Sequence, residues 1–298
     1  MDVELLPEDL APGDRAEAVR DWSDVRVRRV PDGDDPDFAE AYDRLWAEFG
    51  PRGEMEARPV IRERLAWDPS HPLGIPPSRS PGIPPPQALA RAALAYELLV
   101  LRRGGAIAAL RDHTAVVRLD ARGRPVAGPV VVHLSHALVE PAQRGTGLAA
   151  WLRALPLQAA RRCAAAAGCA PGTPVVLVAE MDPPGSAEPG RLARLRSYER
   201  AGFRKIDPEA APYAQPDFRP PEVLAGATPE PVPLGLVLRR VGREDEGALP
   251  AVEVAAVVEA IYAVYAVHVP AAALDGLRDA AARWTARQPT FRLLPPTA

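Results

Sequence analysis

The stretch VEPAQRGTGLA, residues 139–149, decides how the rest of the chain is interpreted. An apolar run ends at Pro141, a loop with Gly145 and Gly147 follows, and a helix is expected to begin at Leu148. The free amides at a helix N-terminus, together with the helix dipole, favour an anion such as a diphosphate, and glycine lets the backbone approach it closely. A plain tight turn is the alternative interpretation. The stretch is not a P-loop, since no Gly-Lys-Ser/Thr follows, and it lacks the third glycine of a dinucleotide-binding fingerprint.

Residue patterns predict the elements on either side of this stretch. Residues 25–30 alternate apolar and charged side chains, which is typical of a strand, and apolar residues over 38–49 recur at helical spacing. Residues 68–87 are too rich in proline for either element. The remaining expected elements are a short helix near 60–67, a helical turn over 88–95, strands at 96–101, 106–119 and 126–139, a helix over 148–167 that Pro156 kinks or splits, a strand at 175–179, a helix over 191–201, a strand at 232–241, and helices near 249–268 and 271–287.

This order predicts an α/β (α+β) fold, with a mixed, mostly antiparallel central sheet flanked by helices and a C-terminal helical extension. We expect a loose N-terminal lead-in at 1–24, one domain at 25–241 and the helical extension at 242–298. Length alone would also allow two domains. Tyr262, Tyr265 and Val269 lie in the most apolar segment, which either packs into the core or forms a homodimer seam.

Composition narrows the function classes. The 298 residues are 47% hydrophobic and 25% charged, and 36 Lys+Arg against 39 Asp+Glu give a net charge of -3, so a nucleic acid or an anionic membrane surface is not an expected partner. Cys163 and Cys169 are the only cysteines, and with no clustered histidines they predict neither a disulfide framework nor a metal site. The acidic N-terminus does not resemble a secretory signal, which favours a cytoplasmic protein without a membrane span.

Two motifs resemble the GCN5-related N-acetyltransferase (GNAT) family. RGTGLA at 144–149 matches the family's Arg/Gln-x-x-Gly-x-Gly/Ala acetyl-CoA signature, and Val139-Glu140-Pro141 matches the Val-x-Pro that usually precedes it. SYERAGF at 197–203 looks like the Tyr-x-x-x-Gly-Phe segment of the family's later helix, and the apolar strand at 175–179 lies between the two. The resemblance covers residues 130–203 and, by the order of elements, extends to 25–241.

The resemblance implies a CoA-dependent N-acyltransferase that uses acetyl-CoA as co-substrate. Such an enzyme transfers an acyl group, usually acetyl, to a small-molecule or protein amine within a ternary complex. One amide at the strand end would polarise the thioester carbonyl. The family implies a strand end that pairs with the pantetheine arm, here Ala137, Leu138 and Val139, and backbone amides that hold the pyrophosphate, here Arg144, Gly145, Thr146, Gly147, Leu148 and Ala149.

Direct transfer needs an acid for the leaving thiolate and a base for the incoming ammonium. Tyr198 occupies the position where many family members place a tyrosine over the sulfur, although it is also suited to plain packing. His133 lies on the strand where some members carry a catalytic glutamate, and an ordinary imidazole titrates near neutral pH. Glu180, His136 and water are the rival bases. Strand alternation places His133 and His136 on opposite faces unless a bulge intervenes.

Several features depart from the family pattern and leave the acceptor open. Pro156, the loop at 181–190, the stretch at 208–231 and the C-terminal residues would reshape the acceptor site without touching the CoA loop. Glu54, Glu56 and Arg58 lie where the family's acceptor site usually begins. The alternative function is a non-catalytic acyl-CoA sensor or protein-interaction module, with the C-terminal helices as its partner surface.

Overall fold

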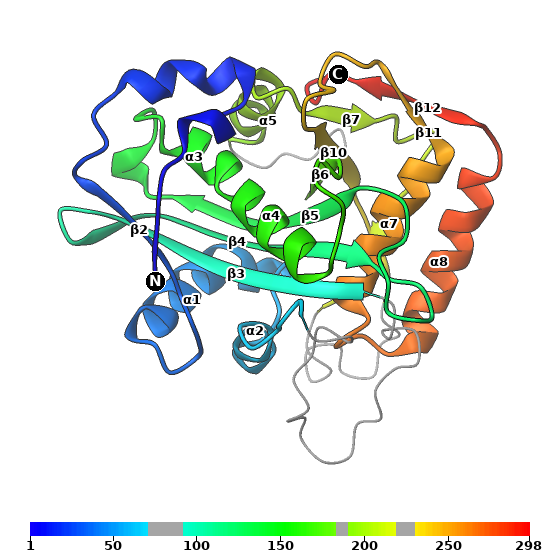
Figure 1. Cartoon of the computed structure of the whole chain (residues 1–298), viewed down its shortest axis with the longest axis horizontal. Coiled ribbons are helices and arrows are strands. Elements are labelled where there is room, and N and C mark those ends of the chain that lie inside the picture. Colours follow the sequence, from blue (N-terminus) through cyan, green and yellow to red (C-terminus); the bar gives the residue numbers. More distant parts are fainter. Residues whose placement is uncertain (71–91, 183–189, 219–229) are drawn as a thin grey trace.

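A computed structural model describes residues 1–70, 92–182, 190–218 and 230–298 (Figure 1). Its centre is a ten-stranded sheet in the order β1-β2-β3-β4-β5-β6-β10-β7-β12-β11. Only β5 and β6 pair in parallel, and the other neighbours are antiparallel. The strands are β1 (Asp2–Val3), β2 (Val25–Arg29), β3 (Ala92–Arg103), β4 (Ala106–Arg118), β5 (Val130–Val139), β6 (Val175–Met181), β7 (Arg204–Ile206), β10 (Gly235–Arg240), β11 (Ala248–Pro250) and β12 (Thr290–Leu294), with β8 (Ala214–Gln215) and β9 (Val232–Pro233) as a separate pair.

Helices cover both faces of this sheet. Helices α1, α2 and α7 lie on one face and α4 and α5 on the other (Figure 1). Their buried side chains form a separate apolar cluster on each face. The predicted mixed, mostly antiparallel sheet flanked by helices is therefore confirmed. The helices are α1 (Pro36–Phe49), α2 (Arg58–Arg64), α3 (Leu148–Ala154), α4 (Pro156–Ala166), α5 (Arg191–Arg200), α7 (Ala251–Tyr265) and α8 (Ala271–Thr285), and short 3₁₀ turns lie at Pro7–Asp9, Pro12–Val19, Gly50–Arg52 and Pro141–Gln143.

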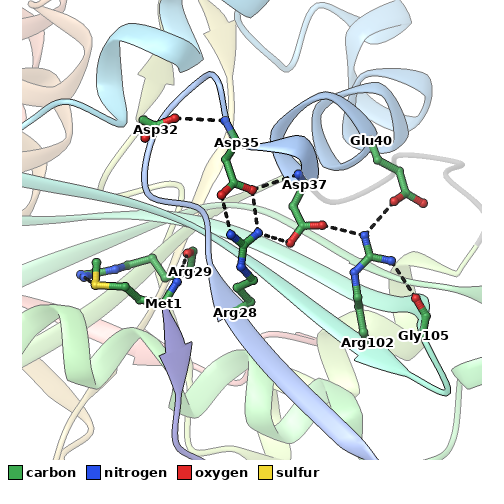
Figure 2. A network of polar contacts seen from close by, with 9 residues as sticks. All are labelled: Met1, Arg28, Arg29, Asp32, Asp35, Asp37, Glu40, Arg102 and Gly105. Atoms are coloured by element: carbon green, nitrogen blue, oxygen red, sulfur yellow. Dashed lines mark hydrogen bonds and ion pairs between the residues drawn. The ribbon is translucent and has the colours of Figure 1, made fainter.

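Charged side chains fix the start of α1 against the sheet, as Figure 2 shows. Asp35 caps the helix by accepting a 3.0 Å hydrogen bond from the Asp37 amide. Arg28 of β2 donates to both carboxylates of Asp35 and Asp37, and Arg102 of β3 donates at 2.8 Å to Asp37 and to Glu40. The acidic cluster that caps α1 therefore also neutralises two strand arginines.

Most predicted elements agree with the structure. Pro156 splits the expected helix into α3 and α4, and the apolar run at 175–179 lies in β6, which has a neighbour on each side. The expected helical turn at 88–95 is wrong for residues 92–95, which begin β3 and are all buried; residues 88–91 lie outside the described ranges. Buried apolar side chains on both faces of β3 explain why alternation is missing there.

Both ends of the chain join the same sheet. In the N-terminal segment, expected as a loose lead-in, Asp2 pairs with Arg28 across β1 and β2, and buried Asp14 accepts two hydrogen bonds of 2.9 Å from Arg153 of α3. At the other end the two expected helices are present as α7 and α8. The strand that follows them, β12, is not among the elements expected from the sequence. It pairs with β7, so the central sheet includes residues beyond 242, where only helices are expected.

Candidate functional site

The parallel strands β5 and β6 separate half-way along their length. Their register runs from Val130 to His133 on β5, and beyond this point β5 pairs only with β4 and β6 only with β10. A cavity of about 120 Å³ opens where they part, lined by His133, His136 and Ala137 from β5 and by Glu180 from β6. The separation therefore brings strand side chains to a cavity in the middle of the sheet.

A second cavity, of about 480 Å³, lies on the side of α3 and α5. It is lined by Leu138, Val139 and most of the 144–149 loop, so it collects the residues that the sequence predicts for CoA binding. The two cavities share five lining residues: Phe49, Arg111, Ala137, Arg194 and Tyr198. The larger cavity thus shares a wall with the His133 cavity, and a molecule bound along the 144–149 loop would reach that wall.

His133 and Glu180, predicted as rival bases, are in contact. His133 Nε2 lies 2.8 Å from a Glu180 carboxylate oxygen; the His133 side chain is buried, and the Glu180 side chain is 9% exposed. Because a carboxylate accepts, the neutral form of this imidazole would carry its proton on Nε2 and its lone pair on Nδ1, and in the charged form both nitrogens are protonated. In the part of the chain that the structure describes, Nδ1 is buried and has no hydrogen-bond partner. The pair therefore forms a carboxylate–imidazole dyad whose free nitrogen can take up a proton.

Two tyrosines complete the surroundings of Glu180. Tyr213 donates to one carboxylate oxygen at 2.6 Å, and Tyr265, the last residue of α7, donates to the other. Burial alone would raise the pKa of Glu180, but hydrogen bonds from His133 and both tyrosines, with the charge of His133, lower it below its usual value. Sequence reasoning assigned neither tyrosine to the site. No local pattern marks them, because Tyr265 ends an apolar helix and Tyr213 lies in a loop.

His136 lies beside the same cavity, because β5 carries a bulge. Thr114 of β4 pairs with His133, and Asp112 pairs with His136, so three steps on β5 match two on β4. Unbroken alternation predicts opposite faces for the two histidines, and the bulge brings both to the cavity. His136 is fully engaged elsewhere, however: Nδ1 lies 3.0 Å from Asp112, and Nε2 donates to the Glu54 carbonyl at 2.9 Å.

The partners of His136 explain its charge. Burial alone would lower the pKa of His136, but the charge of Asp112 and the hydrogen bonds raise it to about 9. The Asp112 carboxyl, which also accepts from Tyr96 at 2.8 Å, has its pKa lowered to about 2 because His136 and Tyr96 outweigh burial. His136 is therefore a structural cation at neutral pH and is poorly suited to be a base.

Tyr198 on α5 lines both cavities and is 8% exposed. Three arginines surround it. Burial alone would raise the pKa of Tyr198, but the positive charges of Arg111, Arg153 and Arg194 lower it. A tyrosine with a lowered pKa gives up its proton more readily, which suits the predicted acid. Its packing against Phe203, at 4.8 Å between ring centres, shows that it also has a structural contact.

The 144–149 loop has the backbone form that its glycines allow. Gly145 and Gly147 have φ values of 77° and 97°, a region that favours glycine. The carbonyl of Thr146 accepts from Arg20 at 2.8 Å, and the Glu17 carboxylate lies where a Cβ on Gly147 would be, only 2.0 Å from that point. The N-terminal segment thus places a carboxylate against the loop. A pyrophosphate bound at the loop would lie close to this negative charge.

The strand end at 137–139 has one paired edge. Ala137, Leu138 and Val139 pair with β4, and no strand of the described residues pairs with the edge that faces β6. This open edge is the feature that an added strand needs. In the early loop, Glu54 and Glu56 line the His133 cavity, whereas Arg58 forms an ion pair with Asp43 of α1.

Comparisons with known proteins add little. No protein-family model matches the sequence, and no curated protein matches it. Among solved structures, the chain is similar to a "Tandem GNAT protein from the clavulanic acid biosynthesis pathway (without AcCoA)", with 19% identity over 64% of this chain and a TM-score of 0.38. The match covers 46% of that protein, so this chain spans about half of its length. A likeness this distant carries no argument about activity.

The described residues form neither a membrane-spanning helix nor a cluster of metal ligands. Among the described residues, no helix combines the length and apolar composition that crossing a bilayer requires. Within the same ranges, no three or more His, Cys, Asp or Glu side chains gather so that they could hold a metal ion.

Proposed function

We propose that this protein is a CoA-dependent N-acyltransferase that transfers an acyl group, acetyl in the simplest case, from a CoA thioester to an amine. The observation that carries the proposal is the shared wall of the two cavities, where Tyr198 stands between the 144–149 loop and the His133–Glu180 dyad. The resemblance of the 144–149 motif to the GNAT signature is the ground for proposing CoA as the acyl carrier. The His133–Glu180 dyad is the proposed proton acceptor.

The proposed reaction moves two protons while one bond forms and another breaks. The amine nitrogen bonds to the thioester carbonyl carbon, and His133 Nδ1 takes the proton that the ammonium must lose. Glu180, held by Tyr213 and Tyr265, fixes the imidazole tautomer and balances the charge that forms on it. The carbon–sulfur bond then breaks, Tyr198 gives its proton to the leaving thiolate, and the second proton of the attacking nitrogen returns to the Tyr198 oxygen, which leaves a neutral amide, free CoA thiol and a protonated His133. Backbone amides at 137–139 and 144–149 would bind the pantetheine arm and the pyrophosphate.

Ligand-dependent unfolding tests the proposed function first. A ligand at one hundred times its Kd adds about 2.7 kcal/mol to the free energy of unfolding. We expect acetyl-CoA, and not ATP, to raise the unfolding temperature, and a panel of amines to release free CoA from acetyl-CoA. A stabilisation with no turnover on any amine would favour the acyl-CoA sensor, and no stabilisation at all would contradict both functions.

Replacing Tyr198 by phenylalanine tests its role as the acid. The ring packing is kept and the proton donor is lost, so kcat should fall by about 10² or more while the Kd of acetyl-CoA stays unchanged. Tyr262→Phe is the matched control, because Tyr262 is also buried but its hydroxyl donates to the Ala214 carbonyl at 2.9 Å, outside both cavities. Equal kcat for Tyr198→Phe and the unmodified protein would remove Tyr198 from the mechanism.

A further inference from the structure

Arg111 of β4 is a buried arginine without a carboxylate partner. It is 1% exposed, no ion pair joins it to an acid within the described ranges, and its Nε has no hydrogen-bond partner there. The neighbouring cations differ, since Arg153 is bound by Asp14 and Arg194 faces Asp182. Keeping a charge away from water without a counter-ion is strongly unfavourable. The described residues therefore leave a buried cation that a ligand anion would neutralise.

The position of Arg111 narrows what that anion belongs to. Arg111 pairs in register with Ala137 and lines both cavities. It therefore stands at the shared wall, next to Tyr198, whereas the 144–149 loop, where the pyrophosphate is expected, lines only the larger cavity. An anion at this place would be part of the reacting molecules, close to the thioester or to the amine.

We propose that Arg111 binds a carboxylate of the substrate, so that the enzyme selects an acyl donor or an amine acceptor that carries one. A guanidinium offers a planar fork of donors that matches a carboxylate, and such charged hydrogen bonds are stronger than neutral ones. The donor would be the CoA thioester of a dicarboxylic acid, and the acceptor an amino acid. The inference rests on the proposed function and adds the substrate class.

Two matched comparisons on the unmodified protein test the inference. They also show whether the recognised carboxylate belongs to the acyl donor or to the amine acceptor. For the donor, the Kd of succinyl-CoA is compared with that of butyryl-CoA, which has the same number of acyl carbons and no carboxylate. For the acceptor, kcat/KM of amino acids with acetyl-CoA is compared with that of the corresponding amino-acid amides. We expect the carboxylate-bearing compound to be preferred about ten- to hundredfold in one of the two pairs.

Variants then assign the preference to Arg111. Arg111→Met should abolish the preference, because it weakens the carboxylate-bearing compound more than its neutral partner, whereas any effect through Tyr198 lowers both members of a pair equally; Arg111→Lys should keep part of the preference. Arg196→Met is the control, because Arg196 is exposed on the same helix as Tyr198 and lines neither cavity. Circular dichroism verifies folding, and the comparisons on the unmodified protein decide the question if Arg111→Met does not fold.

Three results would overturn the inference. Equal values within both pairs would show that no carboxylate is recognised. An equal loss for charged and neutral compounds in Arg111→Met would mean that Arg111 serves CoA itself or only Tyr198. If acetyl-CoA is turned over in either case, the proposed function survives; if no CoA thioester binds at all, the proposed function and this inference fail together.

Discussion

At the residue scale, Glu180 is the side chain on which the proposed chemistry depends most, because its carboxylate is hydrogen-bonded to the imidazole of His133. We expect Glu180→Gln to lower kcat by about 10²–10⁴, since the amide cannot balance the charge of the protonated base. Glu209→Gln, an exposed change of the same kind, should have no effect. Steady-state kinetics with saturating acetyl-CoA measures the loss, and an unchanged kcat would show that the His133–Glu180 dyad does not act as the proton acceptor.

For His136 we predict an effect of pH on the free energy of unfolding, and not on activity. Its folded pKa of about 9 lies above the ordinary value of about 6.5. A raised folded pKa means that the stabilisation is fully present below pH 6.5 and is lost as the pH rises through about 9. Urea unfolding between these pH values should show a falling free energy, and His136→Gln should flatten that part of the curve. A slope that is the same in both proteins would contradict the charged pair.

At the scale of elements, two variants of Asp35 at the start of α1 can distinguish the stability that helix capping contributes from the stability that ion pairing contributes. Asp35 accepts from the Asp37 amide and also binds Arg28 (Figure 2). Asp35→Ala loses both interactions and should lower the free energy of unfolding by about 1–2 kcal/mol. Asp35→Asn keeps the cap, because asparagine caps helices equally well, and should cost clearly less. If the two variants lose the same amount in urea unfolding, the ion pair with Arg28 carries the effect and the cap does not.

The elements that could be predicted are those with a long local pattern. Apolar spacing over 38–49 predicts α1, and the short apolar run at 175–179 predicts β6. Strands β7 and β12 are missed, because three and five residues show little periodicity and their partners are far away in the sequence. The same limit applies to the site. His133 and Glu180 are recognisable as polar residues of apolar strands, but their contact depends on parallel pairing and on where β5 and β6 part.

For the whole molecule, α7 shows how firmly the C-terminal residues belong to the core. Val257 is 0% exposed and Val252, on the same helix, is 76% exposed. Val257→Asp would bury an unpaired charge and should cost more than about 4 kcal/mol or prevent folding, whereas Val252→Asp should change stability by less than about 0.5 kcal/mol. Thermal unfolding distinguishes them. Equal stability would contradict the packing of α7 on the sheet.

The homodimer through the C-terminal helices stays a prediction at this scale. The apolar character of α7 is largely used within the chain, where Val257, Ile261 and Val264 are all buried. Val252→Asp also serves here, because an exposed apolar residue of α7 would lie in any seam that this helix forms. Light scattering after size-exclusion chromatography would reveal a dimer that this substitution dissociates.

The contact between Tyr265 and Glu180 has a consequence for the time at which the protein becomes competent during synthesis. His133 and Glu180 leave the ribosome before Tyr265, which lies 85 residues after Glu180 in the sequence. A nascent chain that already holds β5, β6 and α5 would still lack the hydroxyl that fixes Glu180 and the helix that covers that face of the sheet. The order of the residues thus delays the finished site until α7 has been synthesised, and nascent chains that end before α7 should be inactive.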